Sequence, residues 1–362
     1  MYNVMIAGAG KIGSLIACLL LDSGDYEVHL TDIQFTGSEA RQLLRFFPQI
    51  KTVEMDVNKK GELAAYIKNN KIITIISCLP YFCNEQIALT AIQCDVHYFD
   101  LTEDVSSTAT LKGVAKKSGR AMVPQCGLAP GFVSIAAHHY MQTFDTCFEA
   151  KLRVGSLPQQ VNNSLQYALT WSTDGLLNEY DNLCHGIEAG KSVLAAPLEA
   201  LESIRLDGGH YEAFNTSGGV GGLAERFHGK IDTLNYKTIR YPGHCEKMRF
   251  LMQGLKLNKQ RELLKQILEK AIPKTQQDVV LIYIMVNGEK DGEYLSRSYF
   301  KKIYPKQICD MQWSAIQVST AASVCAVVDI VMSKPECYQG FVSQEDFLLD
   351  DVLSNRFGAF YA

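Results

Sequence analysis

The chain has 362 residues, of which 47% are hydrophobic and 20% are charged, and its formal net charge at pH 7 is −4. This composition fits a soluble globular protein and gives no reason to expect nucleic acid or another polyanion as a partner. The length predicts two domains rather than one core. Eleven scattered cysteines, none with zinc-ligand spacing, predict reduced thiols, no metal site and a cytoplasmic protein. The N-terminus begins directly with a strand pattern, so no signal peptide is expected, and no membrane is expected as a partner.

The first 130 residues alternate strand-like and helix-like segments. Runs rich in Val, Ile and aromatic residues predict strands at 2–8, 26–32, 51–57, 71–79, 96–101 and 121–126. Helical spacing of apolar residues predicts helices between them, at 12–24, 38–47, 61–70, 84–93 and 109–119. Such alternation predicts an α/β fold, a Rossmann-type doubly wound parallel sheet with helices on both faces.

The pattern changes after residue 130. Strands are expected at 148–154 and 165–172, and the segment 277–304 predicts a hairpin that turns between Asn287 and Gly292. Few helices intervene, so residues 131–313 are expected to form an α+β substrate domain. The apolar segment 314–333 is interrupted by polar residues and is expected to be a buried helix rather than a membrane span.

The segment after the first strand carries a dinucleotide-binding pattern. Gly8, Gly10 and Gly13 form G-x-G-x-x-G between a strand and a helix, and Asp32 ends the next strand nineteen residues later, where a carboxylate binds the adenosine ribose. No Arg or Lys follows Asp32 directly, and its charge would repel a 2′-phosphate, so NAD is favoured over NADP. The expected cofactor-binding residues are Gly8, Gly10, Lys11, Ile12, Gly13, Asp32, Asp56, Val57, Cys78 and Leu79.

Several motifs together resemble the saccharopine dehydrogenase-like family, and within it most closely the members that oxidise the side-chain amine of lysine. They are GLAPGF at 127–132, EAFNTSGG at 212–219, YKTIRYPGH at 236–244 and DVVLIYIMVNGEKDG at 278–292. The resemblance implies a Rossmann domain over residues 1–130, a catalytic and dimerisation domain over 131–313, and a C-terminal segment, 314–362, that returns to the first domain. It also implies oxidoreduction at a carbon–nitrogen bond of an amino acid.

Amine oxidation requires a proton acceptor near the amine and an anchor for the substrate carboxylate. Asp100, at the end of a predicted strand, is the first candidate for the acceptor, with Tyr81 as a possible orienting group; Glu103 and Asp104 could be solvated loop charges. The lysine-oxidising members continue with DLGG where this chain has DLTED, which leaves the substrate open.

Two further segments offer substrate contacts. A second glycine-rich segment, NTSGG at 215–219, supplies the Thr216 and Ser217 hydroxyls. No lysine follows it at the spacing of a P-loop, so ATP is not expected. In TWSTDGLLNEY, Thr173 or Asp174 is expected to cap a helix, although some saccharopine-forming relatives carry a basic residue near Asp174.

The segment 235–251 predicts a strand, a Pro-Gly turn and a helix. Arg240 and His244 are then expected to bind a substrate carboxylate at the helix N-terminus, with proton acceptance as a second role for His244. Lys237, Lys247 and Arg249 are expected to be solvated.

The expected function is therefore an NAD-dependent dehydrogenase that deaminates the lysine side chain or a close analogue, as a homodimer or larger homo-oligomer. Two alternatives stay open: a saccharopine- or carboxynorspermidine-type reductase that uses NADPH, and a dinucleotide-binding sensor without turnover.

Overall fold

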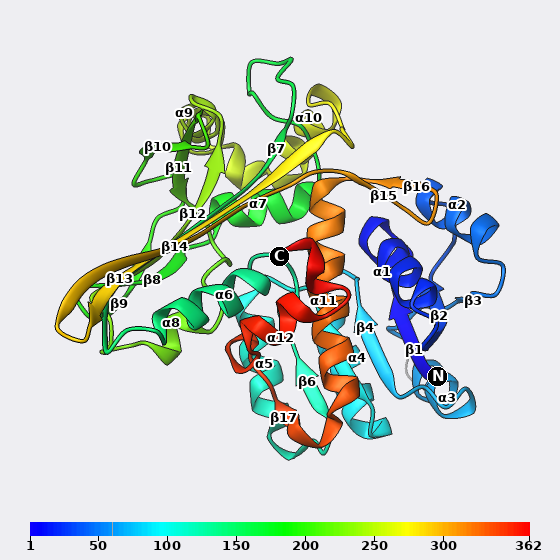
Figure 1. The fold of residues 1–362 in the computed structure, drawn as a ribbon. Helices are drawn as coiled ribbons and strands as arrows, with labels where there is room; N and C mark the ends of the chain where they lie inside the picture. The colour runs from blue at the N-terminus through cyan, green and yellow to red at the C-terminus, as the bar shows by residue number, and fades with distance from the viewer. Residues whose placement is uncertain (60) are drawn as a thin grey trace. The chain divides into compact units, whose positions relative to one another are not determined.

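The computed structural model describes residues 1–59 and 61–362, which form two compact units (Figure 1). The first unit contains residues 1–132, 307–313 and 317–362, and the second contains residues 133–306 and 314–316. The sequence-based division differs at three short segments, because it assigned residues 131–132 and 307–313 to the second domain and residues 314–316 to the C-terminal segment that returns to the first.

The first unit is built on a seven-stranded sheet in which every pair of neighbouring strands is parallel. The strand order is β17-β6-β5-β4-β1-β2-β3. Successive strands are thus added on one side of β1 as far as β3 and on its other side from β4 onward, and the point where this order switches lies between β1 and β4. The predicted doubly wound fold is confirmed. The strands are β1 (Tyr2–Ala7), β2 (Tyr26–Asp32), β3 (Lys51–Glu54), β4 (Thr74–Ser77), β5 (His97–Asp100), β6 (Ala121–Val123) and β17 (Gly340–Phe341).

Helices cover both faces of this sheet, as expected. On one face, Ile75 of β4 and Tyr98 of β5 belong to an apolar cluster with buried residues of α3, α4 and α5. The neighbouring Thr74 points to the opposite face and donates to the Met332 sulfur of α11 at 3.1 Å. The helices are α1 (Lys11–Asp22), α2 (Ser38–Phe46), α3 (Glu62–Asn69), α4 (Tyr81–Cys94), α5 (Val105–Val114), α11 (Ala315–Ser333) and α12 (Leu349–Ser354).

The helix α11 is long and apolar enough to cross a membrane by length and composition alone, with a mean hydropathy of 1.8. However, 83% of its most apolar window is buried inside the structure. Within the first unit, the Tyr26 hydroxyl of β2 donates to Asp329 of α11 at 2.6 Å. The helix therefore packs as a core element, as its interrupted apolar pattern predicted.

The second unit is built on a mixed sheet in the order β10-β11-β12-β7-β13-β14, with β8 and β9 attached at β12. The β12–β7 pair is parallel and the other pairs are antiparallel. The strands are β7 (Thr146–Pro158), β8 (Cys184–Glu188), β9 (Lys191–Ala195), β10 (Glu202–Leu206), β11 (Gly209–Asn215), β12 (Thr233–Arg240), β13 (Asp278–Lys290) and β14 (Glu293–Ile303). The helices are α6 (Phe132–Met141), α7 (Thr173–Asp181), α8 (Leu223–Arg226), α9 (His244–Arg249) and α10 (Arg261–Ala271). A separate short ladder pairs β15 (Lys306–Ile308) with β16 (Met311–Trp313), and all of its residues except Lys306 belong to the first unit.

Two predictions for this unit were wrong in detail. Residues 165–172 do not form a strand; Tyr167 and Leu169 are buried in an apolar cluster with α7 and α10, and this packing replaces strand pairing. The hairpin turns only at Asp291 and Gly292, which both have positive φ. Asn287 instead lies inside β13, at a register irregularity.

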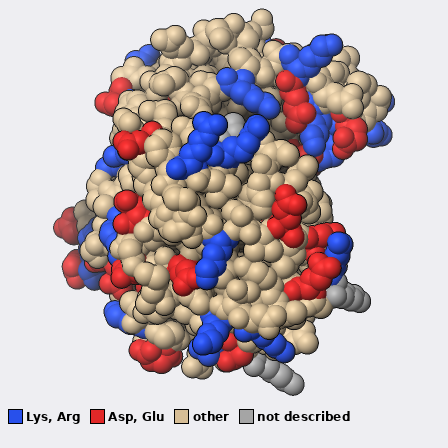
Figure 2. All heavy atoms as spheres, turned by 90° about the vertical axis from the view of Figure 1, so that its right-hand side faces the viewer, with Lys and Arg blue, Asp and Glu red and all other residues tan. Residues whose placement is uncertain are grey.

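On the face that Figure 2 shows, most of the surface is neither basic nor acidic; several Lys and Arg side chains lie together in its upper part, and both charges occur in its lower part. This mixture of charges is typical of an ordinary protein surface.

Candidate functional site

The glycine-rich loop after β1 contains two glycines that the backbone requires and one that leaves space. Gly8 has φ +106°, and a Cβ there would lie 3.1 Å from the Cys78 carbonyl oxygen. A Cβ at Gly13 would lie 1.9 Å from the Gly8 carbonyl oxygen. A Cβ at Gly10 would meet nothing within 4 Å among the described residues, which leaves room for a phosphate group to approach the backbone.

The helix α1 begins directly after this loop. Gly10 is its N-cap, without a side-chain hydrogen bond, and no acidic residue lies in the first turn. The first N–H groups of a helix, here from Lys11 onward, have no intrahelical acceptor and attract an anion. This helix end therefore fits the pyrophosphate of a dinucleotide.

Asp32 ends β2 beside the same loop. One carboxylate oxygen accepts a hydrogen bond from the Ala9 N–H at 2.7 Å, and the other accepts one from the Ile33 N–H at 2.7 Å. These bonds fix the carboxylate while leaving further lone pairs for ribose hydroxyl groups. The predicted ribose-binding carboxylate is thus next to the predicted pyrophosphate site.

The other predicted cofactor residues differ in their surroundings. Cys78 and Leu79 follow β4 and contact the position of Gly8, and burial raises the pKa of the Cys78 thiol to about 12. Asp56 lies in the turn after β3, where it accepts hydrogen bonds from Asn58. Val57 is buried in the apolar cluster beneath the sheet, so its side chain packs in the core.

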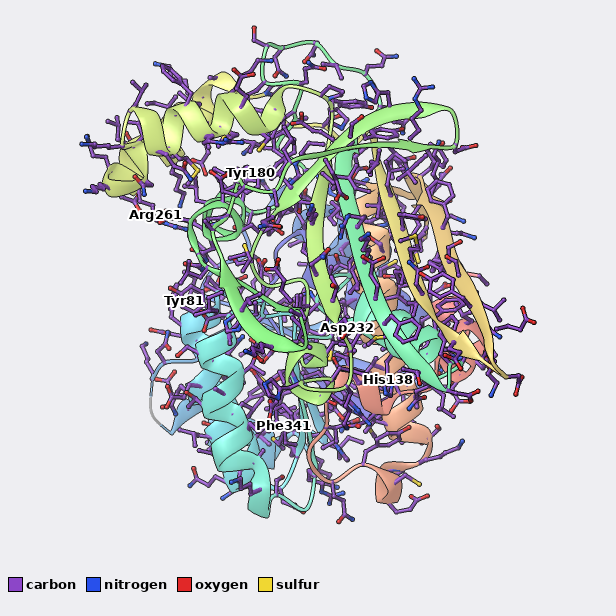
Figure 3. The ribbon with its side chains drawn as sticks, turned by 90° about the vertical axis from the view of Figure 1, so that its left-hand side faces the viewer. Tyr81, His138, Tyr180, Asp232, Arg261 and Phe341 are labelled. Atoms are coloured by element: carbon purple, nitrogen blue, oxygen red, sulfur yellow. The ribbon has the colours of Figure 1, made fainter. Side chains whose placement is uncertain are left out.

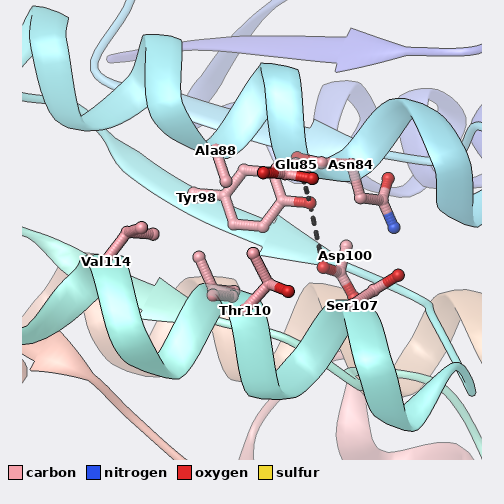
Figure 4. Close-up of a pocket in the computed structure, with 9 residues that line it drawn as sticks. Asn84, Glu85, Ala88, Tyr98, Asp100, Ser107, Thr110 and Val114 are labelled. Carbon is pink, nitrogen blue, oxygen red and sulfur yellow. Dashed lines mark hydrogen bonds between the residues drawn. The ribbon is translucent and has the colours of Figure 1, made fainter.

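Asp100 lines a small pocket between α4 and α5, but its carboxylate is already bonded (Figure 4). One oxygen accepts hydrogen bonds from the Thr102 and Gln125 N–H groups, at 2.9 and 3.1 Å, and the other accepts one from the Tyr98 hydroxyl at 2.9 Å. Burial raises the pKa of Asp100, while these three bonds favour the ionised form. This geometry fits a group that holds the ends of β5 and β6 rather than one that faces an open crevice.

Tyr81 and Asp104 occupy helix N-termini. Tyr81 begins α4, is 46% exposed and contacts the Phe82 ring edge to face. Asp104 is the N-cap of α5 and accepts from the Ser107 N–H at 2.6 Å, so it is a structural cap rather than a solvated loop charge.

In the second unit, Arg240 ends β12 and is 3% exposed. Its Nε–H donates to the Tyr180 hydroxyl at 2.9 Å and its Nη1 to the Ile239 carbonyl at 2.9 Å. The central carbon of the guanidinium lies 5.0 Å from the centroid of the Tyr167 ring. The Nη2 atom lies 3.9 Å from the Oε2 atom of Glu179. Within the described residues Nη2 makes no hydrogen bond, so it remains available to an anion. Tyr180, which belongs to α7, is labelled in Figure 3.

His244 lies next to Arg240 but is completely buried. Its Nδ1 is 2.8 Å from the Leu165 carbonyl, which can only accept, so Nδ1 carries the proton and Nε2 accepts from the Tyr180 hydroxyl at 3.0 Å. Burial and the Arg240 cation lower the pKa of His244 to about 3. The imidazole is therefore neutral and orients Tyr180, which in turn orients Arg240.

The N-terminus of α9 was expected to bind the substrate carboxylate, but a carboxylate of the chain already occupies it. The two oxygens of Glu212 accept hydrogen bonds from the Gly243 and Cys245 N–H groups, at 2.7 and 2.6 Å. Arg240 can still meet an anion, but the helix end cannot contribute.

The second glycine-rich loop, which follows β11 and contains Thr216 and Ser217, is hydrogen-bonded to α7. The Ser217 N–H donates to the Glu179 carbonyl at 3.0 Å and the Ser217 hydroxyl to the Asn178 carbonyl at 3.2 Å. The Thr216 hydroxyl bonds the Thr238 hydroxyl at 3.0 Å. Both predicted hydroxyls thus serve the loop itself, and Ser217 brings it against Glu179.

Two further predictions are corrected. Lys237 is buried rather than solvated, because its ammonium binds Glu202 at 2.7 Å. Ser172, rather than Thr173 or Asp174, caps α7 and accepts from the Gly175 N–H. Lys247 and Arg249 are partly exposed.

Sequence reasoning missed Glu179, Tyr180 and Glu212, although all three lie in segments that it singled out. For Glu179 and Tyr180 the available signal was their position in a short predicted helix, three residues after the apolar pair Leu176 and Leu177, which places them close to its apolar face.

Comparisons with known proteins agree with this architecture. The profile of the saccharopine dehydrogenase NADP binding domain matches residues 4–123, and that of the saccharopine dehydrogenase C-terminal domain matches residues 127–357. The chain is 25% identical to saccharopine dehydrogenase (NADP+, L-glutamate-forming) of Schizosaccharomyces pombe over 214 residues. This aligned segment covers 57% of this chain and 46% of that protein. Over 165 residues the chain is 23% identical to alpha-aminoadipic semialdehyde synthase of Arabidopsis thaliana, covering 43% of this chain and 15% of that protein. The chain thus matches less than half the length of either.

The solved structure of apo saccharopine dehydrogenase (L-Glu forming) from Saccharomyces cerevisiae has the same fold, with a TM-score of 0.79 at 16% identity over 97% of this chain and 96% of that one. A homospermidine synthase from Legionella pneumophila in complex with NAD has a TM-score of 0.66 at 11% identity, over 99% of this chain and 89% of that one. Because the two domain profiles together match nearly the whole chain, the protein belongs to the saccharopine dehydrogenase family.

Proposed function

We propose that this protein is an NAD(P)-dependent dehydrogenase that acts on a carbon–nitrogen bond of an amino acid, by oxidative deamination of the lysine side chain or a close analogue, as an L-lysine 6-dehydrogenase does. The observation that carries the proposal is Arg240, a buried guanidinium that Tyr180 holds in place and whose Nη2 is free to bind a carboxylate. Such an anchor, made before the reaction starts, orients the rest of the substrate.

The first unit supplies the cofactor-binding part of the proposal. The open end of α1, the space at Gly10 and the fixed Asp32 carboxylate would hold the pyrophosphate and the ribose. A bound nicotinamide supplies a hydride acceptor. We propose NAD as the preferred cofactor because the Asp32 carboxylate would repel the 2′-phosphate of NADP.

The alternative within the same family is a saccharopine- or carboxynorspermidine-type reductase that uses NADPH. The name of the Schizosaccharomyces pombe relative, which specifies NADP and glutamate formation, favours it. Initial rates distinguish the two. Lysine with NAD should produce NADH, whereas in the alternative an amino acid and a carbonyl compound, either an aldehyde or a keto acid, should be consumed together with NADPH. A dinucleotide-binding sensor would bind cofactor and show neither reaction.

The role of Arg240 has its own test. Replacing Arg240 with Ala should raise KM for the amino acid by about tenfold or more while NAD affinity stays unchanged, because the anchor is lost and the first unit is untouched. Unchanged kinetics would remove Arg240 from the substrate site. The expectation of a homo-oligomer stays a prediction that light scattering would test.

A further inference from the structure

Glu179 is a buried carboxylate with unused hydrogen-bonding capacity. The residue is 8% exposed, and its Oε2 has no hydrogen-bond partner among the described residues. Leaving a buried charged acceptor unbonded is costly, so native structures rarely keep one without a reason. Its backbone carbonyl, in contrast, is bonded to the Ser217 N–H.

The nearest cation does not satisfy this carboxylate. The Nη2 atom of Arg240 is 3.9 Å from Glu179 Oε2, which is too long for a hydrogen bond. The guanidinium cannot turn freely toward Glu179, because Tyr180 and the Ile239 carbonyl hold two of its other nitrogen atoms. A donor and an acceptor of opposite charge therefore lie side by side, each with bonding capacity left over.

We infer that Glu179 and Arg240 together bind the head group of an α-amino acid, with the α-carboxylate on Arg240 and the α-ammonium on Glu179. An α-amino acid carries these two charges on one carbon atom, and the two side chains place complementary charges 3.9 Å apart. This inference rests on the proposed function and adds to it the substrate class and a specificity-determining residue.

The same spacing assigns the role of Glu179. A carboxylate this close to the α-carboxylate anchor meets the α-amine of lysine and not the reacting amine at the far end of the side chain. Glu179 is therefore a recognition group and not the proton acceptor of the oxidation. Both the lysine-oxidising and the saccharopine-forming reactions use an α-amino acid, so the inference holds for either.

The charge state of Glu179 adds a second readout. Burial raises the pKa of Glu179 to about 7, against the effect of Arg240; Tyr167, Tyr180 and Cys184 are the other titratable groups that face it. Below pH 7 the empty site is partly protonated, and an ammonium ligand binds the ionised form. Affinity for the amino acid should therefore rise with pH between 6 and 8, with a proton released on binding below pH 7.

The test is calorimetric titration of the full chain with three ligands, in the presence of saturating NADH, which fills the cofactor site but cannot oxidise lysine. Lysine carries the whole head group, 6-aminohexanoate lacks only the α-amine, and cadaverine lacks the carboxylate. In the wild-type protein, lysine should bind at least tenfold more tightly than 6-aminohexanoate. Glu179→Gln should raise the Kd of lysine at least tenfold, leave that of 6-aminohexanoate within threefold, and abolish the proton release.

Controls separate this inference from the proposed function. Glu199→Gln changes an exposed carboxylate of the same unit and should behave as wild type. A ratio of lysine to 6-aminohexanoate affinity that is unchanged in Glu179→Gln would overturn the inference, and so would a variant that binds lysine normally but has lost turnover, since Glu179 would then be a catalytic group. Absence of NAD(P) reduction with every amino acid would overturn the proposed function while the binding ratio still tests the inference.

Discussion

The burial of His244 predicts a specific loss of stability in acid. The imidazole has a pKa of about 3 in the folded protein, against about 6.5 in an unfolded chain. Between these values the unfolded state binds a proton that the folded state does not, so the free energy of unfolding falls as the pH drops below 6.5 and levels off near pH 3. Integrating this difference from pH 7 to pH 5 gives a loss of about 2 kcal/mol from this one side chain.

The measurement can be confined to the second unit because the chain has only two tryptophans. Trp171 packs against the apolar cluster that contains Tyr180, so a Trp313→Phe background leaves a fluorophore that reports on this region. Urea unfolding at pH 7 and pH 5 gives the change in the free energy of unfolding between the two pH values. In His244→Gln, whose amide can replace both hydrogen bonds, the loss on going to pH 5 should be smaller than in the wild type by about 2 kcal/mol.

His185→Gln is the matched control, because this histidine lies on the surface and the substitution should leave the pH dependence unchanged. Equal pH dependence in the wild type and in His244→Gln would show that His244 is not buried in the neutral form. The same variant tests the second role expected for His244. As a group that orients Tyr180, it should affect KM more than kcat, whereas a proton acceptor would lose kcat.

Three further predictions concern the cofactor site and the turn after β12. Gly10→Ala should keep the melting temperature of the apo protein but weaken dinucleotide binding by about tenfold, because its Cβ enters open space that the pyrophosphate needs. Gly13→Ala should instead lower the melting temperature, since its Cβ would overlap the backbone carbonyl of Gly8. Asp32→Asn should weaken NAD binding and raise the ratio of NADP to NAD affinity; a ratio that stays constant in fluorescence titrations would show that this carboxylate does not select the cofactor. Glu212→Gln should destabilise the second unit by about 2 kcal/mol in urea, because it weakens the cap of α9, and retention of wild-type stability would contradict that assignment.

The first unit was predictable from sequence because its signals are local. The central strands β1 and β4 are short, mostly apolar and buried runs, and the glycines and Asp32 are separated by a spacing that one βαβ unit fixes. The surroundings of Arg240 were not predictable, because they join residues far apart in sequence. Tyr180 and His244 are 64 residues apart, and the apolar residues of 165–172 satisfy a strand pattern although the fold uses them to fill a core.

The two helix N-termini show why an anion site cannot be assigned from sequence alone. Both α1 and α9 follow a glycine turn, and both satisfy the sequence rule for an anion-binding helix end. The end of α1 has no side-chain cap, whereas the end of α9 is closed by Glu212, which arrives from β11, 31 residues before Gly243. The chain thus neutralises one helix end with its own carboxylate. In the proposed substrate site, Arg240 would therefore hold the carboxylate without help from the end of α9, and Glu179 would contact the ammonium of the same amino acid.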